Sequence, residues 1–405
     1  MNKVVITGII AGVLIAGFIF APFNSGGIPG AAAQVSPQPT GVTKKVLLVA
    51  SEKEVQVAPD NALHPGGVTY NAMVWNGTIP GPIIAVDQGD TLEVTVRNDG
   101  QVIHSLDLHA AIGPSQVLSG NVKPGESKTW TLHANTPGAF IYHCGADGLF
   151  GVWEHMANGM NGAIVVHPQN EKPAKEFYLA FGEIYSDTAD ASKAGSFDLQ
   201  KFLNDNATLV LTNGMAHKYV PSIGEEVKVP LNPNAQPFKV KPGELTRWYV
   251  LNYGPNDGVA FHFISGMLDA VRDGAIKNRY GTTVLNDETW WIPPGSASVV
   301  ETTFPEEGVY VGVDHAMKDV YKGGALAVIA ANNSTLTDQP PGTAVAPKGS
   351  ESVVASNSTL AAVQPLMTGN QTGTETATMM ENNASMMENN PSMTMTEQQA
   401  QNTTG

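Results

Sequence analysis

The residues most able to bind a metal or react lie close in sequence to the only cysteine of this 405-residue chain. His143 directly precedes Cys144, and His155 and Met160 follow it at short intervals. Thiolate, imidazole and thioether groups are ligands that soft transition metals prefer, Cu(I) in particular. A lone cysteine cannot form an internal disulfide, so its presence favours a metal ligand or a reactive group.

Alternation along an extended chain separates these residues into two sites. Neighbouring side chains on a strand point to opposite faces, so His143 and Cys144 must diverge. The upstream segment contains His104, Asp107 and His109. His104 and His109 are separated by an odd number of positions and also diverge, whereas Asp107 and His109 share a face.

This parity defines two ligand sets. The first is a two-histidine, one-cysteine, one-methionine set that suits a blue-copper electron-transfer centre: His104, Cys144, His155 and Met160. The second contains His109 and His143 beside Asp107, and it leaves positions open for a substrate. Because His143 and Cys144 are adjacent, an electron can pass between the two metals through a few covalent bonds.

Short runs of β-branched residues, separated by turn formers, must position these ligands. Such runs occupy residues 45–49, 83–86, 91–96, 129–132, 139–143 and 162–166, and a second series occupies residues 177–181, 208–212, 247–251, 260–263, 298–303, 309–313 and 324–329. Strands at this spacing predict antiparallel β-sandwiches, and therefore an all-β fold. Residues 186–205 are predicted to form a polar crossover that carries some helix.

The two series of strands have a similar plan. A Pro-Gly turn at residues 122–126 precedes Trp130, and another at residues 240–244 precedes Trp248. We interpret this recurrence as a sign of a duplicated domain. The predicted domains are residues 42–170, which carry the cysteine and the histidines around it, and residues 171–331.

The two ends of the chain differ from this body. Residues 4–20 are almost wholly apolar within an uncharged leader, which predicts a signal peptide or membrane anchor over residues 1–33. The body is therefore expected outside the cytoplasmic membrane. Residues 332–405 lack Phe, Trp and Tyr, and they are predicted to form a disordered tail. The methionines of the tail either capture copper or belong to a solvated spacer.

Charge excludes several classes of protein. The net charge is −15 and the sequence pI is about 5.0, so a nucleic-acid partner is not expected. Only 15% of residues are charged, while Gly, Pro, Val and Thr are abundant, which excludes a coiled coil and a disordered body.

At the residues described above, the chain resembles the copper-containing nitrite reductases, which are two-domain cupredoxins that assemble as homotrimers. The resemblance covers about residues 45–331. Its segments are residues 104–113, 142–144 and 153–162 in the first half and 262–266, 288–293 and 308–315 in the second. It implies two tandem Greek-key β-sandwiches of the cupredoxin type.

The resemblance also assigns the ligands of two copper ions per subunit. His104, Cys144, His155 and Met160 correspond to the ligands of the type 1 copper. His109 and His143 correspond to ligands of the type 2 copper, and His315 is expected to complete that site from a neighbouring subunit.

The resemblance further implies how the reaction is catalysed. Asp107 and His262 correspond to the catalytic acid pair, and Ile264 to a residue that restricts how the substrate lies on the metal. Glu288 and Thr289 are expected to orient His262. The implied reaction is the one-electron reduction of nitrite to nitric oxide, with electrons from a small redox donor such as a blue-copper protein or a cytochrome.

The sequence departs from the family pattern at two places. The span from Cys144 to His155 is slightly longer than the common form, which affects the geometry of the first copper site. Met267 stands where many members have a second histidine after the catalytic one, which removes one expected contact.

Two alternative functions remain open at this stage. One is a blue-copper electron carrier without catalysis, in which His262 and His315 are structural. The other keeps both sites but acts on another small nitrogen species, such as hydroxylamine. An oxygen-reducing multicopper oxidase is disfavoured because its trinuclear cluster needs paired His-x-His motifs, and the sequence has none.

Overall fold

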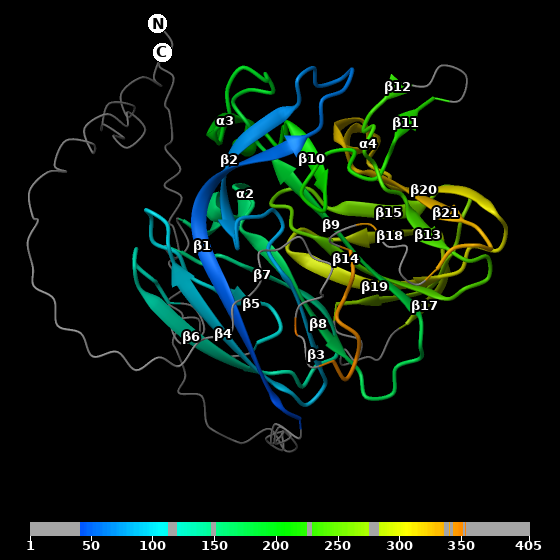
Figure 1. Cartoon of the computed structure of the whole chain (residues 1–405), viewed down its shortest axis with the longest axis horizontal. Helices are drawn as coiled ribbons and strands as arrows, with labels where there is room; N and C mark the ends of the chain where they lie inside the picture. Colours follow the sequence, from blue (N-terminus) through cyan, green and yellow to red (C-terminus); the bar gives the residue numbers. More distant parts are fainter. Residues whose placement is uncertain are drawn as a thin grey trace, which may run out of the picture. The chain divides into compact units, whose positions relative to one another are not determined.

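The computed structural model describes residues 41–111, 120–146, 151–224, 229–274, 283–335, 340, 343–350 and 353 (Figure 1). The predicted leader at residues 1–33 lies outside the described residues. Among the residues that are described, no helix has the length and apolar character needed to cross a membrane.

The first half of the chain forms two four-stranded sheets. One has the order β2 (Val68–Trp75), β1 (Thr43–Ala58), β4 (Thr91–Asn98) and β6 (Ser127–His133), and the other has the order β3 (Ile83–Asp87), β8 (Asn161–His167), β7 (Gly138–His143) and β5 (Asp107–Leu108). Alternate apolar residues of β4, such as Leu92 and Val94, point into a core between the sheets. Cys144 and Met160 lie in this same core.

The second half forms two larger sheets and a short strand pair. The six-stranded sheet has the order β10 (Leu209–Thr212), β9 (Lys175–Ile184), β14 (Thr246–Asn252), β19 (Ser296–Thr302), β16 (Leu268–Asp273) and β17 (Val284–Asp287). The five-stranded sheet has the order β13 (Phe238–Val240), β21 (Ala325–Ala330), β20 (Gly308–Asp314), β15 (Val259–Phe263) and β18 (Thr289–Ile292). The short pair consists of β11 (Ser222–Ile223) and β12 (Val229–Pro230). The buried indole of Trp248 lies 4.5 Å from the Phe177 ring and 4.9 Å from the Phe238 ring, between centroids. The prediction of an all-β fold with two sandwiches is confirmed.

The two sandwiches repeat one pairing scheme. In the first, β1 runs parallel to β4 and β3 runs parallel to β8, and in the second β9 runs parallel to β14 and β13 runs parallel to β21. The two Pro-Gly turns, however, do not occupy equivalent places. The turn at residues 122–126 precedes β6, whereas the turn at residues 240–244 precedes β14, whose pairing corresponds to β4. The same type of turn therefore occurs before two strands that do not correspond to each other in the two sandwiches.

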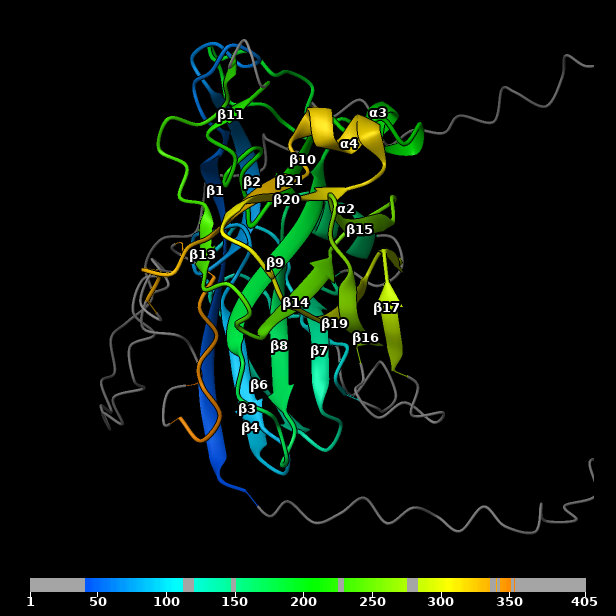
Figure 2. The same cartoon turned by 90° about the vertical axis from the view of Figure 1, so that its right-hand side faces the viewer.

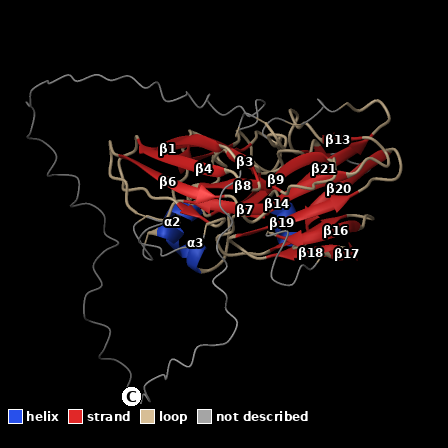
Figure 3. Cartoon of the chain, turned by 90° about the horizontal axis from the view of Figure 1, so that it is seen from below, coloured by secondary structure: helices blue, strands red, loops and turns tan. Residues whose placement is uncertain are grey.

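In the described part of the chain, short helices accompany the sheets: α2 (Val152–Ala157), α3 (Leu199–Leu203) and α4 (Met317–Lys322). Helix α3 lies within the predicted crossover, and the Asp198 side chain caps it by accepting bonds from two backbone N–H groups. Helices α2 and α3 lie side by side (Figure 3), with the rings of Trp153 and Phe202 stacked at 5.2 Å between centroids. This contact supports the helix that carries His155.

An apolar layer joins the two sandwiches. Ile141 of β7 and Val165 of β8 share a buried cluster with Tyr249 of β14 and Val299 of β19. Figure 2 shows β7 and β8 beside β14 and β19. Strand β7 is therefore packed on both faces, against the first core and against the second sandwich, which fixes the strand that leads into Cys144.

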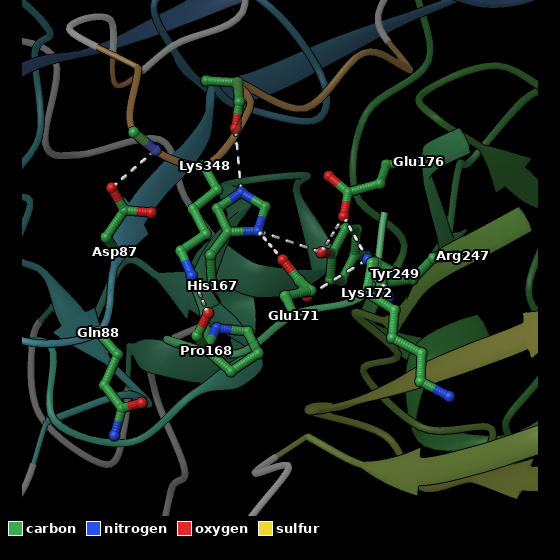
Figure 4. A network of polar contacts seen from close by, with 12 residues as sticks. Asp87, Gln88, His167, Pro168, Glu171, Lys172, Glu176, Arg247, Tyr249 and Lys348 are labelled. Atoms are coloured by element: carbon green, nitrogen blue, oxygen red, sulfur yellow. Dashed lines mark hydrogen bonds and ion pairs between the residues drawn. The ribbon is translucent and has the colours of Figure 1, made fainter. Parts of the chain in front are cut away.

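The buried Arg247 holds together the region where β8 of the first sandwich leads into β9 of the second (Figure 4). The Arg247 guanidinium lies 2.7 Å from a Glu176 carboxylate oxygen, 2.8 Å from Glu301 and 3.4 Å from Glu171. His167 Nδ1 in turn lies 2.9 Å from Glu171. These contacts tie the end of β8 to strands β9, β14 and β19.

The packed body continues beyond the boundary predicted at residue 332. The buried residues Val345, Ala346 and Val353 extend the existing cores. The Ala346 carbonyl accepts a hydrogen bond from His167 Nε2 at 3.0 Å, and the Val353 carbonyl accepts one from the Ala85 N–H at 2.9 Å. A segment without aromatic residues can cover an existing core with short aliphatic side chains, which composition alone does not reveal. Residues 354–405 lie outside the described part of the chain.

Replacing Arg247 with methionine is expected to lower the free energy of unfolding by about 3–5 kcal/mol, because carboxylates buried around the guanidinium would lose their cation. Urea denaturation followed by fluorescence measures this change. Arg97→Met is the matched control, because the Arg97–Asp99 pair is exposed and is expected to contribute less than about 1 kcal/mol. Equal losses for the two variants would contradict the bracing role.

Candidate metal centres

The first candidate centre converges on Cys144 at the end of β7. Cys144 Sγ lies 3.2 Å from His155 Nδ1 and 3.7 Å from His104 Nδ1. All three residues are buried. The Cys144 N–H donates to the Met160 carbonyl at 3.1 Å, which places Met160 beside the cysteine in the same core. The structure thus gathers the four residues predicted for the first site.

The electrostatics of this cluster fit a bound metal cation. Burial raises the pKa of the Cys144 thiol to about 12, although backbone N–H groups, including that of Ser105 at 3.3 Å from Sγ, favour the thiolate. A metal cation supplies the charge that stabilises a buried thiolate, and metal binding displaces the thiol proton. The soft set of thiolate, imidazoles and thioether matches copper.

The second candidate centre lies where β5 pairs with β7. The antiparallel register sets Asp107 directly opposite His143. His143 Nε2 lies 3.0 Å from His109 Nε2 and 3.5 Å from Asp107 Oδ2. The structure thus brings together the three residues predicted for the open site, from a two-residue strand, the residue after it and the end of β7.

Backbone contacts set the protonation state of this centre. His143 Nδ1 lies 2.9 Å from the Cys144 carbonyl oxygen and donates to it. The Nε2 lone pair is therefore directed at His109 and Asp107. Burial lowers the pKa of His143, which favours the neutral imidazole that a metal ion requires. The Asp107 side chain is half exposed, which leaves it accessible to a small anion.

The structure places the predicted residues of the second half around the end of β15. His262 and His315 have ring centroids 5.3 Å apart. His262 Nδ1 donates to the Glu288 backbone carbonyl at 2.7 Å, and Thr289 Oγ1 lies 3.4 Å from the same nitrogen. Glu288 contacts His262 through its main chain, not through its carboxylate. Ile264 is half exposed nearby in sequence.

These second-half histidines do not complete the second centre within one chain. Four groups of three or more potential ligands occur among the described residues, and neither His262 nor His315 belongs to any of them. The set of His109 and His143 therefore supplies two imidazoles, with Asp107 beside them.

The other two groups of potential ligands already hold a cationic side chain. Arg247 pairs with Glu171 and Glu176 in the first, which also contains His167. In the second, which consists of Glu183, Asp205 and Asp257, the ammonium of Lys318 contacts Asp257. A cationic side chain thus already neutralises part of the carboxylate charge in each cluster.

Sequence reasoning missed two groups that contact the first centre. One is the Ser105 backbone N–H, which donates to the Cys144 sulfur. The other is Glu52, whose Oε1 lies 3.3 Å from His104 Nε2. Ser105 follows a predicted ligand directly, but its role depends on its main chain and not on its residue type. Glu52 is remote in sequence and carries no local signal.

Comparison with known proteins first identifies the fold. A family model described as multicopper oxidase matches residues 56–171. A solved multicopper oxidase superposes with a TM-score of 0.57 at 21% identity, covering 71% of this chain and 89% of that chain, which is a likeness of fold alone. Both similarities agree with the cupredoxin-type sandwiches described above.

More specific similarities connect the chain to one family. A copper nitrite reductase structure from Nitrosomonas europaea has a TM-score of 0.62 and 32% identity, covering 73% of this chain and 96% of that chain. A copper-containing nitrite reductase of Neisseria gonorrhoeae is 33% identical over 71% of this chain and 70% of its own length. One from Alcaligenes faecalis is 29% identical over 69% of this chain and 73% of its own length. These similarities, together with the two clusters on either side of β7, show that the chain belongs to the family of copper-containing nitrite reductases.

Proposed function

We propose that this protein reduces nitrite to nitric oxide by one electron, at a type 2 copper that receives electrons from a type 1 copper. The observation that carries the proposal is the position of two adjacent residues in two different clusters. Cys144 faces His104 and His155, while His143 faces His109 and Asp107. A single peptide unit therefore links an electron-storing site to an open, reactive one.

The donor sets suit these two roles. The first set is enclosed in the core, which limits reorganisation around a metal that changes oxidation state. The second set is partly accessible through Asp107. Bound copper supplies one-electron redox chemistry at the first set, and at the second it binds and polarises the anion.

Side chains of this protein would deliver the protons that the reaction consumes. Reduction of nitrite to nitric oxide and water consumes one electron and two protons. Asp107, which lies 3.5 Å from His143 Nε2, would hydrogen-bond a substrate oxygen and pass a proton to it. His262, whose Nδ1 proton is held by the Glu288 carbonyl, is left with Nε2 to exchange the second proton. Ile264 is the proposed substrate-positioning residue.

We propose that the active assembly is a homotrimer in which His315 of one subunit completes the type 2 site of another. Among the described residues, neither His315 nor His262 belongs to the group of potential ligands that contains His109 and His143. Several large apolar side chains of the second sandwich are exposed, which suits a covered interface: Ile264, Met267, Trp291, Val309 and Met317. The assembly would hold two copper ions per subunit.

Partners and location follow from the same proposal. A small redox protein, such as a blue-copper protein or a cytochrome, would deliver electrons to the type 1 site. The apolar leader predicted at residues 1–33 supports a location outside the cytoplasmic membrane. Fractionation of the producing cells, followed by detection of the protein, tests this location.

Replacement of Asp107 with asparagine is expected to lower nitric oxide formation by about 10²–10⁴-fold, because the amide cannot deliver a proton. Nitric oxide release from nitrite and a chemical reductant measures the effect, alongside the copper content. Asp99→Asn is the control, because it removes an exposed acid of the same sandwich. Full turnover of Asp107→Asn with both coppers bound would overturn the assignment, and an inactive unmodified, copper-loaded protein would overturn the function itself.

Replacement of Cys144 with serine is expected to reduce the copper content from about two ions per chain to about one. The visible thiolate-to-copper absorption band should disappear, since a serine hydroxyl is a poor ligand for the soft site. Elemental analysis and absorption spectroscopy measure both effects. Retention of two coppers, or of the band, would contradict the ligand assignment.

Replacement of His315 with alanine is expected to remove the type 2 copper and to leave the thiolate-to-copper absorption band intact. The same two measurements apply, with His133→Ala as a control because His133 lies on strand β6 and contacts Thr91. If His315→Ala kept two coppers per chain, the shared type 2 site would be wrong. One copper in the unmodified protein would instead favour an electron carrier.

A further inference from the structure

The carboxylate of Glu52 lies against the outer side of the His104 imidazole. Glu52 Oε1 is 3.3 Å from His104 Nε2, while Nδ1 on the inner side of the ring is 3.7 Å from Cys144 Sγ. One ring therefore has the thiol on one side and a carboxylate on the other. The His104 side chain is fully buried, and that of Glu52 is one-third exposed.

The segment just before His104 holds the Glu52 carboxylate in place. Glu52 Oε2 accepts a hydrogen bond from the Gln101 N–H at 2.9 Å. Gly100 packs so closely on the carboxylate that a methyl group there would lie 2.7 Å from Oε2 and 2.8 Å from Oε1. Strand β1 fixes the other end of the side chain through its pairing with β2, where Glu52 faces Met73. The position of the carboxylate is thus built into the fold.

This arrangement determines which nitrogen of His104 carries the proton. A metal bound beside Cys144 uses the Nδ1 lone pair, so the neutral ring carries its proton on Nε2. The Nε2–H then donates to the Glu52 carboxylate. Such a carboxylate–histidine–metal arrangement orients the ring and makes the ligating nitrogen more basic, which stabilises the more highly charged metal.

We propose that Glu52 is a positioning residue of the type 1 centre that orients His104 and lowers the reduction potential of the copper bound there. This inference rests on the proposed function, because it requires the first cluster to hold a redox-active copper. A lower potential at this site increases the driving force for electron transfer toward the His109–His143 pair. Glu52 would thus set how readily the stored electron leaves.

A matched control separates this contact from a general effect of negative charge. Glu54 lies two residues along the same strand on the same face, about 7 Å away. Glu52 and Glu54 line one surface hollow of about 320 Å³, and Glu54 is exposed. Removing the Glu54 charge changes the local field without touching the His104 ring.

The test is a spectroelectrochemical titration of the visible copper band in the full-length, copper-loaded protein and three variants. Glu52→Gln replaces the charged acceptor with a neutral one, which binds the Nε2–H more weakly. Gly100→Ala keeps the charge but displaces the carboxylate from the ring. Both should raise the preference for Cu(I) over Cu(II) about tenfold, which corresponds to about 59 mV. Glu54→Gln should leave the potential unchanged.

Three results would overturn the inference. An unchanged potential in Glu52→Gln would remove the role of Glu52, and equal shifts in Glu52→Gln and Glu54→Gln would reduce the effect to distant charge. A potential unchanged in Gly100→Ala would exclude the positioning contact. Failure of the proposed function has a different signature: the unmodified, copper-loaded protein would release no nitric oxide from nitrite, whatever its potential. Absence of the thiolate-to-copper band in the unmodified protein would remove the first copper site and the inference with it.

Discussion

The antiparallel pairing of β5 with the end of β7 is the constraint on which the rest of the site depends. It sets Asp107 opposite His143, and it turns the next side chain, Cys144, toward the other face of the strand. A shift of one residue in this register would exchange the faces and mix the two ligand sets. The pairing involves only two residues of β5, so its position must be fixed by what surrounds it.

The two sandwiches supply that support by enclosing β7. One face of the strand packs into the first core, where the thiol of Cys144 is buried, and Ile141 on the strand belongs to the layer shared with the second sandwich. The ion pairs of Arg247 hold the segment between β8 and β9 against this body, and residues 343–350 and Val353 cover the edge strand β3. Most of the described chain thus serves to hold two small groups of side chains on opposite faces of β7.

Much of this could be predicted from sequence, because alternation is a local property. The separation of His143 from Cys144, the grouping of Asp107 with His109 and the longer strands all follow from residue order. What could not be predicted depends on the fold in three dimensions. The strand β5 is too short to give a pattern, and the contact of Glu52 with His104 joins residues 52 positions apart in sequence. The packed residues Val345, Ala346 and Val353 lack the apolar run that marks a core segment. The Pro-Gly turns misled because a local turn can recur before strands that are not equivalent.

The central claim, that adjacent side chains serve one storage metal and one reactive metal, is tested most directly by electron paramagnetic resonance of the copper-loaded protein with and without nitrite. The account predicts two distinct copper signals, one from a thiolate-bound copper and one from a copper with imidazole ligands, with nitrite changing only the second. A single signal, or a change in the thiolate-bound copper on addition of nitrite, would contradict it.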